Sequence, residues 1–255
     1  MGTEAKPDPP GAPIDCHRLE LAACDAKDFA MLDPSERGRA ARFKFERDRT
    51  RYIAAHAQTR RHLGARLNLA PVAVPLTTTA NGKPVLDIEA ALLAGAGPAA
   101  ANLCFNLTHS GAVGYLAIAS FSVGIDVELQ RSLGDLQSLI DCYCSPAEVA
   151  ALAAMPDAVR TMGFLGVWTR KEAALKAWGT GIGAIPLNEL HVGTGTAGTA
   201  PLEMLGAGTA YRGNDDSPAG RPGLRLSTIH GAAEVLSIAA AVDGPLAIRM
   251  AASQR

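Results

Sequence analysis

The sequence predicts an α+β fold arranged as one or two domains. Its 255 residues can bury one large core, or two cores in domains of about 100–150 residues each. Hydrophobic residues make up 48% of the chain and charged residues 19%, a globular composition. Short runs rich in β-forming residues alternate with longer segments of helical spacing, so both kinds of element are expected in one chain.

The first part of the chain combines one strand with a basic helical region. Residues 1–13, with four prolines and two glycines, are expected to be a disordered lead-in. Ile14–Ala23 predicts a strand, and Asp33 followed by Pro34 predicts the cap and first turn of a helix. Arg37–Arg66 has helical spacing and a local excess of eight positive charges. Such a positive surface can attract and hold an anion.

The middle of the chain predicts strands separated by a loop. Leu69–Thr79 predicts a short strand that ends at an Asn-Gly turn. Ala90–Asn102 is broken by glycine and proline and is expected to be loop. Leu103–Gly111 then runs into an apolar strand, Ala112–Ala119, and Phe121–Glu128 is expected to be its hairpin partner.

The last part predicts helices followed by strands. Ser145 and Glu148 have the spacing of a capping box, so Glu148 is interpreted as a helix cap and not as a catalytic residue. A helix over Trp168–Trp178 is expected to stop at Gly179. Strands are expected at Glu189–Val192, Leu202–Met204, Leu224–Ile229 and Glu234–Val242, with a long polar loop over Gly206–Gly223.

Charge and composition exclude several classes of protein. The net charge of −1 argues against a protein that coats nucleic acid or an anionic membrane. No apolar run reaches the roughly 18 residues of a membrane-spanning helix, and the first residues lack the apolar core of a signal peptide. We therefore expect a cytoplasmic protein. The five cysteines show no zinc-ligand spacing and are interpreted as reduced thiols.

One predicted strand carries a pair of carboxylates. Asp126 and Glu128 alternate with Ile125 and Val127, so the acidic side chains face one way and the apolar ones face a core. A solvent-exposed strand face is the alternative interpretation of this pattern.

A second pattern lies on a predicted helix. Trp168, Glu172 and Lys176 recur every four residues and therefore share one helix face. We expect Trp168 to be core or pocket wall, and a solvated face is the alternative for the two charged residues. If this helix packs on the strand, three carboxylates meet near a lysine, which suits a hard cation and a phosphate.

Four motifs, in order and at suitable spacing, resemble those of the Sfp-type 4′-phosphopantetheinyl transferases. They are Asn81-Gly82-Lys83-Pro84, Phe105-Asn106-Leu107-Thr108-His109-Ser110, Gly124-Ile125-Asp126-Val127-Glu128 and Trp168-x-x-Lys171-Glu172-x-x-x-Lys176. The regions Arg39-x-x-Arg42-Phe43 and Asp48–Arg51 are similar to the N-terminal signature of that family. The resemblance covers the chain from about Asp33 to Val192.

The resemblance implies a fold of two α/β halves related by a pseudo-twofold axis, with coenzyme A between them. Residues 14–123 would form the half for the 3′-phosphate and adenine. Residues 124–245 would form the half for the metal and the transfer chemistry, and residues 246–255 would be a tail.

The same resemblance implies a reaction. The 4′-phosphopantetheine group of coenzyme A would pass to a serine of an acyl, peptidyl or aryl carrier protein, releasing adenosine 3′,5′-bisphosphate. The length of the chain resembles that of the large monomeric type of these transferases. Fatty acid, polyketide, nonribosomal peptide and siderophore pathways all stay open, and so do two other classes of function. These are a Mg²⁺-dependent phosphohydrolase and a catalytically idle module that binds coenzyme A or a carrier protein.

The family resemblance also assigns residues. Mg²⁺ would be held by Asp126, Glu128 and Glu172, and Glu172 is our first choice as the base that accepts the serine proton. Coenzyme A would be bound by Thr108 and His109 at its 3′-phosphate, by Lys83, Arg42 and Arg51 at the same phosphate or the adenine end, and by Lys171 and Lys176 at the reacting phosphates.

Overall fold

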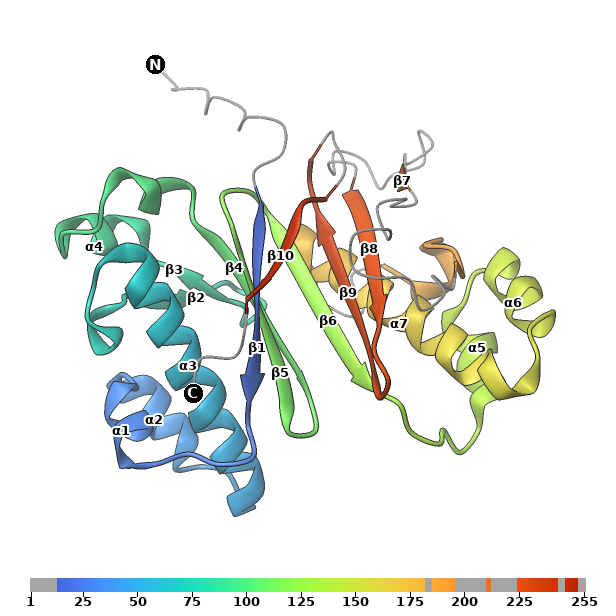
Figure 1. Cartoon of the computed structure of the whole chain (residues 1–255), viewed down its shortest axis with the longest axis horizontal. Coiled ribbons are helices and arrows are strands. Elements are labelled where there is room, and N and C mark those ends of the chain that lie inside the picture. Colours follow the sequence, from blue (N-terminus) through green and yellow to red (C-terminus); the bar gives the residue numbers. More distant parts are fainter. Residues whose placement is uncertain (1–12, 182–184, 196–209, 212–223, 243–245, 252–255) are drawn as a thin grey trace.

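The computed structural model contains two four-stranded sheets that lie side by side, with helices on their outer sides (Figure 1). It describes residues 13–181, 185–195, 210–211, 224–242 and 246–251. The strand orders are β10-β1-β5-β4 in one sheet and β6-β9-β8-β7 in the other. The predicted α+β architecture of two halves is confirmed.

The first sheet joins segments from both ends of the chain. Its strands are β1 (Ile14–Glu20), β4 (Cys104–Ser110), β5 (Val113–Ala119) and β10 (Ile248–Ala251). β4 and β5 form a hairpin, and β10 pairs parallel with β1. The expected tail at residues 246–255 therefore contributes a strand to the first half.

Helices and a small hairpin cover the first sheet. They are α1 (Ala26–Met31), α2 (Pro34–Ala40), α3 (Glu46–Leu67) and α4 (Ile88–Leu93), together with β2 (Leu76–Thr78) and β3 (Pro84–Leu86). As predicted, Asp33 caps α2 by accepting from the Glu36 amide. The basic region is two helices, because a turn at residues 41–45 interrupts it. The prediction of a loop at Ala90–Asn102 was wrong, because this segment contains most of α4 and a short 3-10 helix (Pro98–Asn102).

In the part of the second half that the structure describes, three α-helices lie on the outer side of the sheet. Its elements are β6 (Val123–Leu129), α5 (Leu136–Tyr143), α6 (Pro146–Ala153), α7 (Asp157–Trp178), β7 (Ala210–Tyr211), β8 (Leu224–His230) and β9 (Glu234–Ala240). The strand expected at Glu189–Val192 was wrong: Glu189 ends a 3-10 helix (Leu187–Glu189), and residues 190–192 have no regular secondary structure. The expected strand Leu202–Met204 and most of the Gly206–Gly223 loop lie outside the described residues. Among the described helices, none is long and apolar enough to cross a membrane.

The hairpin expected between Ala112–Ala119 and Phe121–Glu128 was wrong. β6 pairs antiparallel with β9 in the second sheet, with Asp126 opposite Ser237. Its apolar side chains Ile125 and Val127 are fully buried in a core shared with both sheets, a larger apolar surface than a hairpin partner alone would offer. The strand therefore opens the second half.

Gly124 lets α7 lie directly against β6. A Cβ atom at this position would overlap the carbonyl oxygen of Ala173 and the amide nitrogen of Ala177. Only glycine allows two backbones to approach this closely. The contact sets the distance between the acidic residues of β6 and the polar face of α7.

Gly124→Ala should therefore destabilise the protein by about 1–3 kcal/mol, the usual cost of overpacking, and should move α7 away from β6. The measurement is denaturant unfolding. Gly134→Ala is the matched control, because a Cβ there meets no atom within 4 Å. Equal stabilities for the two variants would contradict the close contact.

Candidate active site

A buried acid and a lysine form the centre of the site. Asp126 on β6 is 6% exposed, and its Oδ1 lies 2.6 Å from the Lys176 amine on α7. The Thr108 hydroxyl donates to the same oxygen at 3.0 Å. Three elements, β4, β6 and α7, therefore converge on one carboxylate.

Two carboxylate oxygens beside this pair have no partner. Asp126 Oδ2 and Glu172 Oε1 are buried and make no hydrogen bond. Burial raises the pKa of Glu172, and the negative charges of Asp126 and Glu128 raise it further. Burial also raises the pKa of Asp126, against the opposing effect of Lys176. Lys176 pairs with one oxygen of Asp126 but leaves Asp126 Oδ2 and Glu172 Oε1 without a partner, an environment that a cation would stabilise.

The donor set fits Mg²⁺ in its chemistry. All three acidic side chains offer oxygen ligands, which this ion prefers, and bound phosphates and water can complete its shell. Among the described residues, no group of three or more histidine, cysteine or acidic side chains is already arranged to hold a metal ion. Instead, Lys176 occupies one oxygen of Asp126.

Lys83 approaches the same cluster from the β2–β3 hairpin. Its amine donates to the Lys176 carbonyl at 2.7 Å, and the neighbouring Asn81 side chain donates to the Gly179 carbonyl at 3.1 Å. Burial lowers the pKa of Lys83, and the charge of Lys176 lowers it further. The hairpin of the first half is thus fastened to the end of α7.

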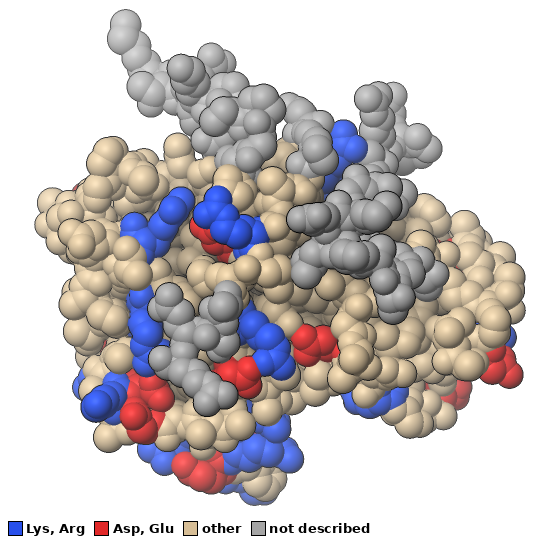
Figure 2. Space-filling view, in the orientation of Figure 1, with Lys and Arg blue, Asp and Glu red and all other residues tan. Residues whose placement is uncertain are grey.

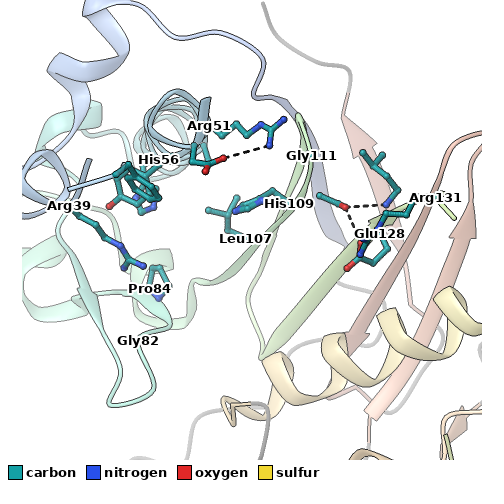
Figure 3. A pocket seen from close by; sticks show the side chains of 16 residues that line it. Arg39, Arg51, His56, Gly82, Pro84, Leu107, His109, Gly111, Glu128 and Arg131 are labelled. Carbon is teal, nitrogen blue, oxygen red and sulfur yellow. Dashed lines mark hydrogen bonds and ion pairs between the residues drawn. The ribbon is translucent and has the colours of Figure 1, made fainter. Parts of the chain in front are cut away.

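A pocket of about 880 Å³ opens next to the cluster (Figure 3). It lies between α2 and α3 on one side and the ends of β4 and β6 on the other. Its lining residues are Arg39, Phe43, Asp48, Arg51, Tyr52, Ala55, His56, Gly82, Pro84, Leu107, His109, Ser110, Gly111, Glu128, Leu129 and Arg131. Its volume is within the usual range for small-molecule sites.

The pocket is positively charged on the side of the first half. Arg39 and Arg51 line it on that side, Arg131 lines it from the second half, and Figure 2 shows Lys and Arg side chains gathered mainly over the half that carries α2 and α3. Burial lowers the pKa of His109, and the charges of Lys176, Arg51 and His56 lower it further. An imidazole of this kind stays neutral at pH 7 and can still donate one N–H.

Comparisons with known proteins agree with this geometry. Residues 25–122 match the family model described as "4'-phosphopantetheinyl transferase, N-terminal", and residues 122–217 match "4'-phosphopantetheinyl transferase superfamily". The chain is 34% identical over 179 residues to the 4'-phosphopantetheinyl transferase HetI of Nostoc sp., which covers 70% of this chain and 71% of HetI. The chain belongs to the 4'-phosphopantetheinyl transferase superfamily.

More distant relatives extend the match. A phosphopantetheinyl transferase of Thraustochytrium sp. is 30% identical over 184 residues, 68% of this chain and 58% of that protein. The 4'-phosphopantetheinyl transferase Sfp of Bacillus subtilis is 23% identical over 176 residues, 69% of this chain and 72% of Sfp. The resemblance inferred from the motifs is confirmed, and the chain is a transferase of this family.

The structure brings most of the predicted site residues of this transferase together. Arg51, His109 and Glu128 line the pocket, and Asp126, Glu172 and Lys176 form the adjoining cluster. The Lys83 amine lies beside it, on the Lys176 carbonyl. Arg42 is exposed in the turn after α2 and does not line the pocket.

Thr108 was predicted to bind the 3′-phosphate, but its side chain does not face the pocket. Because side chains alternate along β4, Leu107 and His109 face the pocket while Thr108 faces β6. Its hydroxyl is buried on Asp126, and the next residue on that side, Ser110, donates to Glu128 Oε2 at 3.0 Å. Thr108 therefore orients a carboxylate and does not line the pocket.

Lys171 was also assigned wrongly. Its amine is buried against Glu148 Oε2 at 2.7 Å and donates to the carbonyls of Tyr143 and Leu187. Next to Glu172 on the helix, it points about 100° away, since successive helical residues differ by that angle. Glu148 caps α6 as predicted, and it also accepts from the Val192 amide.

Three basic pocket residues, Arg39, His56 and Arg131, had no assigned role in the sequence. Arg39 lies in a motif that carried the resemblance, but His56 and Arg131 do not. One signal could have found His56: Asp48, Arg51, Tyr52, Ala55 and His56 have the spacing of a single helix face, and all line the pocket. Arg131 follows β6 in a segment without periodicity.

Lys171→Met should lower the free energy of unfolding by about 3–5 kcal/mol, because it leaves the Glu148 carboxylate buried without its charge partner. Denaturant unfolding measures this change. The double variant Lys171→Met/Glu148→Gln should recover part of the loss. Wild-type stability combined with lost ligand affinity would instead restore Lys171 to the ligand site.

Glu172→Gln should unfold at a higher temperature than the wild type at pH 8 without divalent cations. A carboxyl whose pKa is raised in the folded state costs stability above that pKa, and the cost disappears as the pH falls below the unfolded value. The gain should be about 2–4 °C, as about 1 kcal/mol gives in a protein of this size. It should vanish near pH 4. A lower unfolding temperature of Glu172→Gln at pH 8 would contradict the repulsion between Glu172 and the carboxylates of Asp126 and Glu128.

Proposed function

We propose that this transferase moves the 4′-phosphopantetheine group of coenzyme A to a serine of an apo carrier protein, releasing adenosine 3′,5′-bisphosphate. The observation that carries this proposal is the acidic cluster of Asp126 and Glu172, with its unpartnered oxygens, beside an arginine-lined pocket. One part suits a cation and the other suits the phosphates of a nucleotide. The partner would be an acyl, peptidyl or aryl carrier protein.

Mg²⁺ would be held by Asp126, Glu128 and Glu172. When bound, it supplies positive charge at the diphosphate and a template for its orientation. Two of these side chains, Asp126 and Glu128, are already oriented, because Thr108 and Ser110 donate to them. Transfer of a phosphate-containing group asks a protein mainly for such positioning and charge stabilisation.

The remaining chemistry falls to residues of α7 and the pocket. Lys176 would stabilise negative charge on the leaving phosphate, since its amine already lies against the cluster. Glu172, whose raised pKa makes it a better proton acceptor, would receive the serine proton directly or through water. His109 and Arg51 would hold the 3′-phosphate of coenzyme A.

Mass spectrometry of an apo carrier protein, incubated with coenzyme A, Mg²⁺ and the full chain, tests the proposal. The carrier should gain one phosphopantetheine group, and Glu172→Ala should lower the rate by about 10²–10³. An undiminished rate in a folded Glu172→Ala protein would remove Glu172 from its role. Hydrolysis of coenzyme A without a gain on the carrier would indicate a phosphohydrolase. Binding of coenzyme A without turnover would indicate a binding module.

A further inference from the structure

The pocket contains an imidazole that is fixed from behind by a carboxylate. His56 Nδ1 lies 2.8 Å from Glu36 Oε1, and the His56 side chain is 17% exposed. Burial alone would raise the pKa of Glu36, but hydrogen bonds and charges from His56 and Arg60 outweigh it and lower that pKa. Glu36 is therefore ionised at neutral pH and can only accept, so Nδ1 must be the donor.

Glu36 itself is held in place. Its second oxygen accepts from Arg60 Nε at 2.6 Å. Arg60 is completely buried and also donates to the carbonyls of Pro71 and Val74 and to the Asp33 carboxylate. A carboxylate fixed in this way sets both the orientation and the tautomer of its imidazole.

The other ring nitrogen of His56 is available to a ligand. Among the described residues, Nε2 has no hydrogen-bond partner, and the residue lines the pocket together with Arg39 (Figure 3). The ring lies 4.0 Å from that of Tyr52, which fixes its plane further. The charged and titratable groups around it are Asp33, Glu36 and Arg39 on α2, Arg51, Tyr52 and Arg60 on α3, and His109 on β4.

We propose that Glu36 and His56 form an anion-binding dyad, in which Glu36 positions the imidazole and His56 donates from Nε2 to a phosphate monoester of the bound ligand, the imidazole being protonated in the complex. Because Nδ1 carries the hydrogen that is donated to Glu36, Nε2 of a neutral ring has none, and donation to a phosphate requires the ring to take up a proton. The inference rests on the proposed function, because coenzyme A carries a single phosphate monoester, on its 3′-hydroxyl.

Proton uptake is the consequence that separates this dyad from a purely structural contact. If His56 gains a proton when the phosphate binds, affinity must fall as the pH rises. Phosphate monoesters have a second pKa of about 6, so between pH 7 and 8.5 the ligand stays mostly dianionic. A loss of affinity over that range would then come from the protein.

Isothermal titration of the full chain with coenzyme A and with 3′-dephospho-coenzyme A tests the dyad. The His56→Asn variant keeps a donor near the Nδ1 position but has nothing at Nε2. It should bind coenzyme A about 10–100-fold more weakly, the effect of losing a charged hydrogen bond, and its affinity for the dephospho form should be unchanged. At pH 7.5, titrations in buffers of different ionisation enthalpy should show proton uptake with coenzyme A in the wild type and less in the variant.

Two further variants complete the design. His56→Gln reaches the Nε2 position with an uncharged N–H, so it should recover part of the affinity without the proton uptake. His62→Asn is the matched control, because His62 lies on the same helix but stacks on His17 outside the pocket, and it should bind as the wild type does.

The possible failures are distinct. Equal losses for both ligands in His56→Asn, or no loss, would overturn the dyad. Absence of proton uptake by the wild type would do so without any variant, even if His56→Asn does not fold. A wild-type chain that binds neither ligand would instead overturn the proposed function.

Discussion

The contact between β6 and α7 at Gly124 is the constraint on which the site depends. The backbones of β6 and α7 approach more closely than a side chain at position 124 would permit. As a result, Glu172 and Lys176, one turn apart on α7, face Asp126 and Glu128, two residues apart on β6. Asp126 and Lys176 meet at 2.6 Å as a result. The buried apolar residues of β6 hold the strand in register with β9, and register decides which side chains face the helix. Packing of the second half therefore determines the geometry of the acidic cluster.

The two halves meet along β4 and β6 through side chains rather than a backbone ladder. Asn106 accepts from the Ile125 amide at 2.8 Å, and Ser110 accepts from the Leu129 amide at 3.2 Å. Thr108, between them, donates to Asp126. Alternate residues of β4 thus join the sheets, and the residues in between face the pocket. One strand both connects the halves and contributes to the ligand site.

Buried carboxylates inside and outside the site differ in whether all their oxygens have partners. Glu148 has Lys171 and three backbone amides as partners, and Glu36 has Arg60 and His56. These networks are satisfied and hold segments of the fold together. Asp126 and Glu172, in contrast, each retain a buried oxygen without a partner. Unpartnered buried carboxylates of this kind are concentrated at functional sites.

Much of this protein was determined by local sequence. Capping residues such as Asp33 predicted where helices begin, and the alternation around Asp126 predicted that Ile125 and Val127 face a core, because both depend on neighbours along the chain. Four short motifs were enough to indicate the family. The tertiary structure alone decided that β6 pairs with β9 and that β10 pairs with β1. It also decided that Thr108 and Lys171 contact the carboxylates of Asp126 and Glu148 and do not line the pocket. It also brought His56 to Glu36 and to the pocket. Each of these depends on contacts between distant segments, and spacing along the chain carries no information about which distant partner a strand edge or a buried charge will find.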